Sequence, residues 1–298
     1  MLHAPPGRKV VLGIGDDAAA WKPSRSHLSV ITTDALVENV HFQLDRVSFQ
    51  EIGQLACAAN VSDIAAMGAR PILATVSIGV SQRVEPRAII DIYRGIDALA
   101  RTAKLEIAGG DITRSSELFI AMTVVGEVSP TSLKRRSGAR PGDVVAVTGA
   151  LGAARAALES NVAHVPQPRV AEGRWLGRSR SVRAMMDLSD GLAIDLGRMA
   201  RASQCGAAVD DVPVEPAAQA LAASRGQNPA RFAAEGGEDF ELLVAIAPRA
   251  FTYLSGRFRK RFGRPLLQVG AFREGAGVVI KTAGGEEPLA GGWDHLAR

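Results

Sequence analysis

Residues 10–35, VVLGIGDDAAAWKPSRSHLSVITTDA, place two strand-like runs too close together for a helix to connect them. Only eight residues, AAWKPSRS, separate Ala18 from the run HLSVITTD, and they include Pro23 and no apolar repeat at helical spacing. A parallel pair of strands needs a crossover of about a dozen residues or more. The stretch therefore predicts an antiparallel hairpin, strand to acidic turn to strand, and not a dinucleotide-binding βαβ unit.

The turn of this hairpin would carry Asp16 and Asp17 directly after the glycines of GIG. Two carboxylates at that point would repel a phosphate group unless cations lay between them. The segment therefore predicts phosphate binding through metal ions and not through a glycine-rich loop.

The composition is that of a folded protein with one large or two medium domains: 298 residues, 47% hydrophobic and 22% charged. No apolar run approaches the roughly 20 residues of a membrane span, and the first residues lack a secretory apolar core. We therefore expect a cytoplasmic protein with no membrane partner. Cys57 and Cys205 lack the spacing of a metal site or a disulfide framework, so we expect two buried free thiols.

The formal net charge is +4, yet the basic residues are scattered and aromatic residues make up only 5% of the chain. Nucleic-acid-binding surfaces usually gather basic residues and interleave aromatic ones for base stacking. We therefore expect no nucleic-acid partner.

Helices and strands are expected to alternate in both halves of the chain, which predicts a mixed α+β (α/β mixed) fold. In the first half, apolar periodicity predicts helices over 48–69 and 85–105 and strands over 71–80 and 116–128, with residues 105–111 as a strand running into a glycine turn. The segment 129–143 is rich in Ser, Gly, Pro and charge, and we place the boundary between a 1–137 domain and a 138–298 domain there. The second half is expected to contain strands at 143–149, 184–190, 206–212, 240–247, 265–272 and 277–282, and helices from 151, over 191–203 and over 249–262.

Short acidic stretches stand at the predicted ends of strands or helices. A single Gly–Asp pair usually only makes a turn, but loops at one edge of a sheet often converge on a site. Oxygen ligands alone suit hard cations, and Mg²⁺ with phosphate is the usual combination. The stretches are Gly15-Asp16-Asp17, Thr32-Thr33-Asp34, Asn60-Val61-Ser62-Asp63, Gly109-Gly110-Asp111, Asp187-Leu188-Ser189-Asp190-Gly191 and Gly236-Gly237-Glu238-Asp239.

Neither the glycine-rich loop with its following lysine nor the protein-kinase motifs occur in the sequence. If ATP binds, it therefore binds through metal ions and arginines on a different scaffold.

The order and spacing of eight motifs resemble the thiamine-monophosphate kinase family, of the ATP-binding superfamily of aminoimidazole-ribonucleotide synthetase. The motifs are GIGDDAA, TTDALVENVHF, ANVSDIAAMGARP, AGGDITR, KRRSGARPGDVVAVTGALG, MDLSDGLAIDLGRMARAS, GGEDFELL and GGWDHL. The resemblance implies a two-domain fold, in which an N-terminal mixed sheet with helices binds ATP and magnesium and forms a homodimer. The C-terminal α/β domain would complete the active-site cleft.

The same resemblance implies ATP-dependent phosphorylation of thiamine monophosphate to thiamine diphosphate, the final step of thiamine diphosphate synthesis. Since the second pKa of a phosphate monoester is about 6, the acceptor oxygen is largely ionised at neutral pH and no general base is needed. We expect direct in-line transfer, assisted by several Mg²⁺ ions and without a phosphoenzyme.

The resemblance assigns roles to individual positions. Asp34, Asp111, Arg136 and Asp190 would be catalytic. Mg²⁺ would be held by Asp17, Thr32, Thr33, Asp34, Asp63, Asp111, Asp187 and Asp190. ATP would contact Gly110, Asp111, Arg136 and Ser189. Thiamine monophosphate would be lined by His41, Glu238 and Trp293.

Other interpretations of these positions stay open. His41 fits a core or rim histidine, Trp293 fits packing of the C-terminus, Glu238 fits a solvated turn and Arg136 fits a linker charge. For the whole chain, the alternatives are a different ATP-dependent synthetase of the superfamily and a non-catalytic nucleotide or thiamine-phosphate binder.

One departure from the family concerns the main chain. Asn39 stands where the family usually has glycine. Asparagine tolerates the left-handed backbone that a glycine would supply, so we expect the local conformation to be kept.

Overall fold

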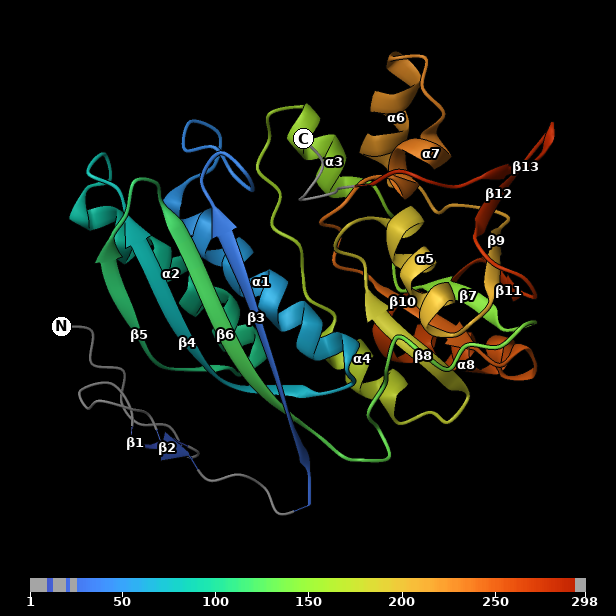
Figure 1. The fold of residues 1–298 in the computed structure, drawn as a ribbon, viewed down its shortest axis with the longest axis horizontal. Coiled ribbons are helices and arrows are strands. Elements are labelled where there is room, and N and C mark those ends of the chain that lie inside the picture. The colour runs from blue at the N-terminus through green and yellow to red at the C-terminus, as the bar shows by residue number, and fades with distance from the viewer. Residues whose placement is uncertain (1–9, 13–19, 22–25, 293–298) are drawn as a thin grey trace. The chain divides into compact units, whose positions relative to one another are not determined.

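The computed structural model describes residues 10–12, 20–21 and 26–292. The chain divides into two compact units (Figure 1). The first ends at Leu133 and also includes Asn161–Val170, whereas the second comprises Lys134–Ser160 and the chain from Ala171 onward. The functional boundary near residue 137 stays a prediction. No helix within the described ranges is long and apolar enough to cross a membrane.

The first unit is built on a four-stranded sheet in the order β3-β6-β4-β5. Neighbouring strands are antiparallel except β4 and β5, which are parallel and are joined by a helical crossover, as parallel neighbours require. The strands are β3 (Leu28–Val37), β4 (Arg70–Val80), β5 (Glu106–Arg114) and β6 (Phe119–Val128).

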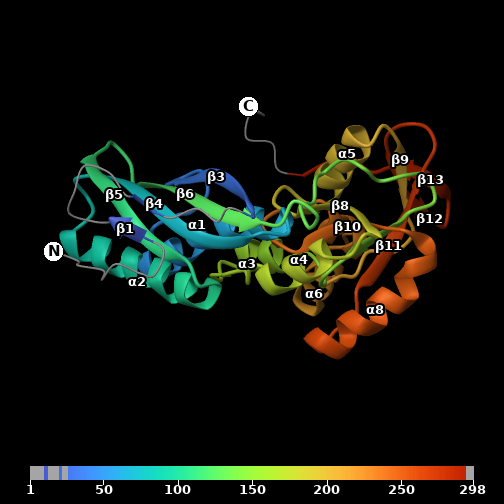
Figure 2. The ribbon, with the colours of Figure 1, turned by 90° about the horizontal axis from the view of Figure 1, so that it is seen from below.

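Two helices, α1 (Phe49–Ala66) and α2 (Pro86–Ala103), cover one face of this sheet (Figure 2). Ser48 and Glu51 form a capping box at the start of α1, and a proline begins α2. Buried Ala, Ile and Val side chains of the helices pack on the same face of the strands. The other face is left without a helix among the described residues, and Ile31 there is 72% exposed.

The second unit contains a seven-stranded sheet in the order β13-β12-β9-β11-β7-β10-β8. Its strands are β7 (Val144–Val147), β8 (Val182–Asp187), β9 (Gly206–Val209), β10 (Leu242–Ile246), β11 (Leu267–Arg273), β12 (Val278–Thr282) and β13 (Gly285–Pro288). The helices are α3 (Ala153–Glu159), α4 (Val170–Gly177), α5 (Leu192–Ala202), α6 (Pro216–Ser224), α7 (Pro229–Ala234) and α8 (Pro248–Phe262).

The hairpin prediction for residues 10–35 is wrong, because the two predicted strands do not pair with each other. Val10–Leu12 (β1) pairs antiparallel with Ala20–Trp21 (β2), whereas β3 pairs along all its 10 residues with β6. A long partner strand offers more ladder bonds and more side-chain contacts than a three-residue neighbour, so the non-local pairing prevails. The turn residues Asp16 and Asp17 lie outside the described residues.

Two acidic motifs expected at strand ends lie inside strands instead. Thr32-Thr33-Asp34 occupies the middle of β3, and Gly109-Gly110-Asp111 lies within β5, where a glycine turn was predicted. In both cases the neighbouring strand supplies hydrogen bonds that override the local turn preference of Gly and Asp.

Other expectations are confirmed. The chain mixes helices and sheets, and the two helices predicted in the first half are present as α1 and α2. Cys57 and Cys205 are free and buried. Asn39 adopts the left-handed backbone expected of it, with a φ of 65°.

Candidate active site

In the first unit, β3 and α1 bring together four polar residues of the acidic motifs. Thr32 Oγ1 donates a 2.5 Å hydrogen bond to Asp63 Oδ2, and the Asp34 main-chain N–H donates to Asn60 Oδ1 at 3.0 Å. Asn60 and Asp63 are three residues apart and therefore share one face of α1. This group, Thr32, Asp34, Asn60 and Asp63, is called the β3–α1 cluster below.

Thr33 does not join the β3–α1 cluster through its side chain. Its hydroxyl donates to Met122 O at 2.9 Å and accepts from Thr123 Oγ1 at 3.1 Å, on the sheet face that the helices leave uncovered. Successive residues of a strand point to opposite faces, so Thr33 is separated from Thr32 and Asp34 by the sheet.

Asp111 lies on the opposite edge strand of the sheet. The register aligns Asp34 with Met122, Met122 with Val76 and Val76 with Gly110, so three strand spacings of roughly 4.8 Å, about 14 Å in all, separate Asp34 from the Gly110-Asp111 step. Asp111 is exposed and is aligned with Ser77, on the uncovered face. A single cation bound to one copy of the chain therefore does not reach both Asp34 and Asp111.

His41 follows β3 in a tight turn. Its Nδ1 accepts a 3.1 Å hydrogen bond from the Val37 main-chain N–H, which places the proton of the neutral ring on Nε2. The ring is partly buried. Glu38, which directly follows β3, is held in place as well. Its buried carboxylate accepts hydrogen bonds from the Arg83 guanidinium and from the Leu118 main-chain N–H.

In the second unit, two motif loops lie side by side. Asp187 ends β8, and the Glu238 N–H donates to Ser189 O at 2.8 Å while the Phe240 N–H donates to Leu188 O at 2.9 Å. These bonds extend the β8–β10 ladder beyond the strands. They bring Ser189 and Asp190 next to Glu238.

This pairing requires unusual main-chain conformations. Glu238 and Phe240 have φ values of 66° and 49°, which are uncommon for residues with side chains and for a bulky aromatic above all. Gly191 has a φ of 102° and a ψ of 155°, and a Cβ there would lie 2.8 Å from Gly236 O. Strain of this kind is typical of functional sites, where surrounding structure holds the main chain in place.

The carboxyl groups of this loop pair have raised pKa values. Burial and, as the smaller cause, the nearby Asp190 carboxylate raise the pKa of Glu238 to about 7, although solvent reaches this side chain and screens part of the effect. Burial also raises the pKa of Asp239 to about 7, against main-chain hydrogen bonds at the start of α3 that favour its charged form. Asp239 accepts these bonds from the Gly152 and Ala154 N–H groups, so it caps α3.

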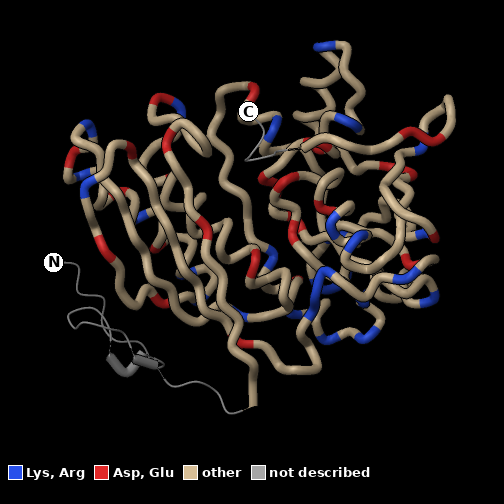
Figure 3. The backbone as a smooth tube through the Cα atoms, viewed as in Figure 1, with Lys and Arg blue, Asp and Glu red and all other residues tan. Residues whose placement is uncertain are grey.

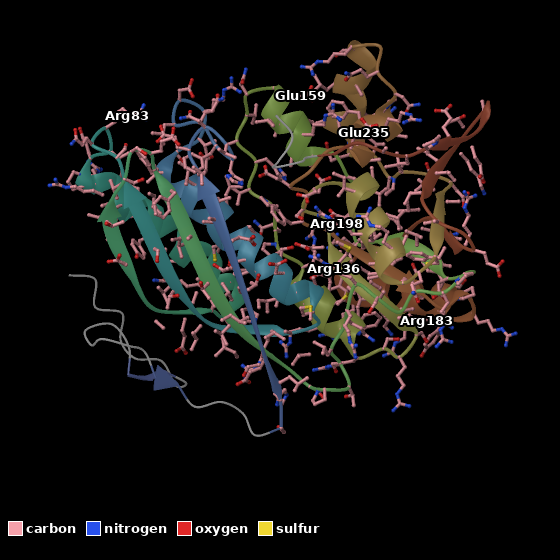
Figure 4. All side chains as sticks on the ribbon, in the orientation of Figure 1. Arg83, Arg136, Glu159, Arg183, Arg198 and Glu235 are labelled. Carbon is pink, nitrogen blue, oxygen red and sulfur yellow. The ribbon has the colours of Figure 1, made fainter. Side chains whose placement is uncertain are left out.

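Arg136 belongs to a segment that is fixed along the second unit. The buried Lys134 ammonium donates to Ser179 O and Val182 O, at 2.8 and 2.7 Å. Ser203 Oγ, at the end of α5, donates to Arg136 O and accepts from the Gly138 N–H. The main chain at Arg136 is therefore held on both sides, and its exposed side chain is labelled in Figure 4.

Asp190 is tied to helix α5. The Asp190 N–H donates to Asp195 Oδ2 at 3.0 Å, and Arg198 forms ion pairs with both carboxylates. Burial raises the pKa of Asp195 to about 6. Asp195 and Arg198 were missed in the sequence, where their spacing of three residues on a predicted helix was the available signal.

Two of the expected site residues, Asp17 and Trp293, lie outside the described residues. The last described residue, Gly292, has a φ of 139°, and a Cβ there would lie 2.7 Å from Asp190 O. The chain therefore passes Asp190 immediately before Trp293.

Asn60 and Asp239 are further residues of these clusters that were not assigned a role from the sequence. The signal for Asn60 was its position one helical turn before Asp63. For Asp239, which caps a helix more than 80 residues earlier in the chain, the sequence carries no local signal.

The donors of the β3–α1 cluster are hydroxyl, carboxylate and amide oxygens, the ligands that suit Mg²⁺. Within the described ranges, no three His, Cys, Asp or Glu side chains gather closely enough to hold a metal ion by themselves. Magnesium is usually bound by one or two carboxylates together with substrate phosphates and water. The residues therefore fit magnesium that is bound jointly with a nucleotide.

Comparison with known proteins first gives the class of fold. Residues 15–128 match the family model described as AIR synthase related protein, N-terminal domain. The crystal structure of thiamine-monophosphate kinase from Stenotrophomonas maltophilia superposes with a TM-score of 0.83 at 32% identity, and covers 92% of this chain and 91% of that one. The predicted AIR synthetase-like fold is therefore confirmed.

Relatives that are similar along nearly the whole chain identify the family. The thiamine-monophosphate kinase of Rhodopirellula baltica is 34% identical over 299 residues, which span 96% of this chain and 92% of the relative. AaThiL complexed with AMPPCP and TMP has a TM-score of 0.79 at 28% identity, with 92% of this chain and 89% of that one covered. The chain belongs to the thiamine-monophosphate kinase family.

Proposed function

We propose that this protein transfers the γ-phosphoryl group of ATP to thiamine monophosphate, yielding thiamine diphosphate and ADP. The observation that carries the proposal is similarity along nearly the whole chain to thiamine-monophosphate kinases, together with a related ThiL complex that contains an ATP analogue and TMP. The oxygen-rich clusters described above supply the matching chemistry. ATP use also supports a cytoplasmic location.

In the transfer, an oxygen of the thiamine monophosphate phosphate attacks the γ-phosphorus of ATP, and the bond from that phosphorus to the β–γ bridging oxygen breaks. The attacking oxygen is already largely ionised because the second pKa of a phosphate monoester is about 6. No residue is needed to remove a proton. The main task of the protein is to bring two anions together and to hold them in line.

Magnesium, when bound, would offset the charge that accumulates on the phosphoryl oxygens. The carboxylates proposed to hold it are Asp34 and Asp63 of the β3–α1 cluster, Asp111 on β5, Asp187 at the end of β8, Asp190 after it and Asp17, together with the hydroxyl of Thr32. The Thr33 side chain faces away from this cluster, so its main-chain carbonyl oxygen is the atom proposed as a magnesium ligand. The separation of Asp34 from Asp111 supports more than one ion.

Arg136, Gly110 and Ser189 are proposed to contact ATP. A guanidinium suits a phosphate group because its planar fork of N–H donors matches the phosphate oxygens, and the main chain that carries it is held in place. A Cβ at Gly110 would lie 1.9 Å from Val76 O, so the glycine keeps β5 close to β4 at this point. Ser189 offers a hydroxyl next to Asp190.

His41, Glu238 and Trp293 are proposed to line the thiamine monophosphate pocket. The imidazole of His41, whose Nδ1 accepts the Val37 N–H, is proposed to contact the phosphate of the substrate. Glu238 carries a negative charge above a pH of about 7, and this charge would attract the cationic thiazolium ring. An indole face at Trp293 would favour the same ring.

We also propose a homodimer that forms through the uncovered face of the four-stranded sheet. Thr33, Thr123 and Thr75 align across three neighbouring strands of this face, and Ile31 beside them is 72% exposed. These small hydroxyl and apolar side chains carry no charge and are suited to burial against a second copy, whereas the charged Asp111 lies on the edge strand β5 of the same face.

The experiment that tests the activity compares acceptors. Purified protein is incubated with ATP and Mg²⁺ and either thiamine monophosphate or unphosphorylated thiamine, and products are separated by chromatography. Thiamine diphosphate is expected from the monophosphate alone, and EDTA should abolish it. ADP release without thiamine diphosphate would instead favour another substrate of the same superfamily.

A further inference from the structure

Arg198 lies between two acidic side chains at the start of α5. Its Nη1 is 2.8 Å from Asp195 Oδ1, and the same nitrogen forms an ion pair with Asp190 Oδ2. The exposed fraction is 36% for the Arg198 side chain, 12% for Asp190 and 0% for Asp195. The guanidinium, labelled in Figure 4, is therefore the solvent-accessible end of a buried acidic pair.

Asp195 is committed to protein partners through both of its oxygens. Oδ1 bonds Arg198, while Oδ2 accepts the Asp190 main-chain N–H at 3.0 Å. A buried carboxylate with both oxygens engaged is a poor ligand for an incoming ion. Asp195 therefore anchors Arg198 and the Asp190 main chain. Of the two carboxylates, that of Asp190 is the one open to a cation.

We propose that Arg198 is the resident counter-ion of Asp190, with which a divalent cation has to compete. The inference rests on the proposed function in one respect, since it takes Asp190 to be a ligand of that cation. A positive charge already held on a carboxylate weakens its attraction for a second cation at close range. The long, partly exposed arginine side chain is able to move aside while Asp195 stays in place.

The ion pair between Arg198 and Asp190 affects the order in which the cation and the nucleotide bind. When nucleotide is absent, Asp190 is neutralised by Arg198 and the cation binds weakly. ATP brings additional negative charge, which restores the attraction for the cation. Arg198 therefore couples cation binding to nucleotide binding, and its removal should weaken that coupling.

The test is a titration of the full-length protein with Mn²⁺ alone, followed by the electron paramagnetic resonance signal of the free ion. In Arg198→Met the competing charge is lost, so Mn²⁺ should bind about tenfold more tightly than to wild type. In Arg198→Lys the charge is kept, and the affinity should stay near that of wild type. Repeating the titration with AMPPCP should show a smaller gain in affinity for Arg198→Met than for wild type.

Arg201 provides the matched control. It lies on the same helix, is exposed, and forms no ion pair with another described residue. Arg201→Met changes the net charge equally, so its Mn²⁺ affinity should remain close to the wild-type value. Thermal melting of each variant shows that the fold is retained.

Three results would overturn the proposal. One is an Arg198→Met affinity that is unchanged or weaker, and another is Arg198→Lys binding Mn²⁺ as tightly as Arg198→Met. The third is a wild type that binds no Mn²⁺ even when AMPPCP is present. Failure of the proposed function looks different, because wild type would then make no thiamine diphosphate whatever its affinity for Mn²⁺.

Discussion

At the scale of residues, the candidate site consists of short-range contacts that orient oxygen atoms. Thr32 bonds Asp63 across the β3–α1 interface, and Asn60 holds the main chain at Asp34. These contacts fix the Asp63 carboxylate and the main chain at Asp34 before any ligand arrives. Preorganised charge of this kind contributes to catalysis because it does not have to be rearranged during the reaction.

Replacement of Asp34 by asparagine tests this view. The variant keeps the Asp34 main-chain bond to Asn60 and nearly the same volume, but loses the negative charge. We expect kcat to fall by about a hundredfold or more, with an unchanged melting temperature because Asp34 is exposed. Asp97→Asn, on the exposed side of α2, is the control and should keep full activity.

The same variant can also contradict the assignment of Asp34 as a cation ligand. If Asp34→Asn retains near wild-type kcat, the assignment of Asp34 to the cation is wrong. If it loses activity only because it unfolds, circular dichroism will show that loss directly.

Gly191 is a second residue with a sharp expectation. Its φ and ψ are nearly exclusive to glycine, and a Cβ would also meet Gly236 O. Gly226 has a φ of 67° as well, but open space where the Cβ would be. Gly191→Ala should therefore lower the free energy of unfolding by about 2 kcal/mol more than Gly226→Ala does.

Urea unfolding of the two alanine variants measures this difference. Equal losses would mean that the contact between the Asp190 and Glu238 loops is not tight. In Gly191→Ala, any activity that survives should show a raised KM for thiamine monophosphate, because the Glu238 loop is displaced.

At the scale of elements, the second unit places helix ends against carboxylates. The most instructive case is α3, whose first N–H groups are capped by Asp239 from a distant loop. The N–H groups favour the charged carboxylate, yet burial raises its pKa to about 7 from an ordinary value of 3.8. The folded protein therefore binds a proton at Asp239 that the unfolded chain has already released.

This difference sets a pH dependence. Between pH of about 4 and about 7 the native state holds more protons at Asp239 than the unfolded state, so stability falls as pH rises through this window. Asp239→Asn removes the titration and keeps an oxygen for the cap. Its free energy of unfolding should therefore decline less than that of wild type between pH 5 and pH 8.

Urea titrations at the two pH values check this expectation. Parallel declines for wild type and Asp239→Asn would show that Asp239 titrates near its ordinary value in the folded protein. Glu238 changes in the same direction as Asp239 and is present in both proteins, so it cancels in the comparison.

How far the sequence predicts the elements depends on local signals. The helices α1 and α2 were predicted because their caps and apolar periodicity are contained in the segment itself. The helices α4, α6 and α7 were not, since they are short and α6 and α7 are rich in alanine without a clear apolar repeat. The partner of β3 was mistaken, because β6 lies about 90 residues further along the chain.

The site shows the same division. Its carboxylates are visible in the sequence, as recurring acidic motifs after apolar runs. Their grouping is not, because it depends on which strands are neighbours and on which face a residue lies. Thr33 and Asp111 illustrate this, since the sheet separates both from Asp34.

At the scale of the whole molecule, acidic and basic residues are interspersed along the chain and not gathered in one block (Figure 3). A net charge of +4 is small against the combined negative charge of ATP and a phosphate monoester. Neutralisation of the substrates therefore has to be local. That favours metal ions and single, well-placed arginines over a general basic surface.

The proposed dimer also belongs to this scale. Thr75→Arg introduces a charge on the uncovered face of the sheet, which should prevent a second copy from packing there. Light scattering after size exclusion should give the mass of two chains for wild type and of one chain for the variant. Thr102→Arg, on the exposed side of α2, makes the same change away from this face and should leave the mass unaltered. A dimeric Thr75→Arg would place the interface elsewhere.

The most direct test of the central claim follows the γ-phosphoryl group itself. The protein is mixed with thiamine monophosphate, Mg²⁺ and ATP labelled with ³²P in the γ position, and the label is traced in product and protein. The account predicts that the label appears in the terminal phosphate of thiamine diphosphate, with none retained on the protein. Label recovered only as inorganic phosphate, or bound covalently to the protein, would contradict it.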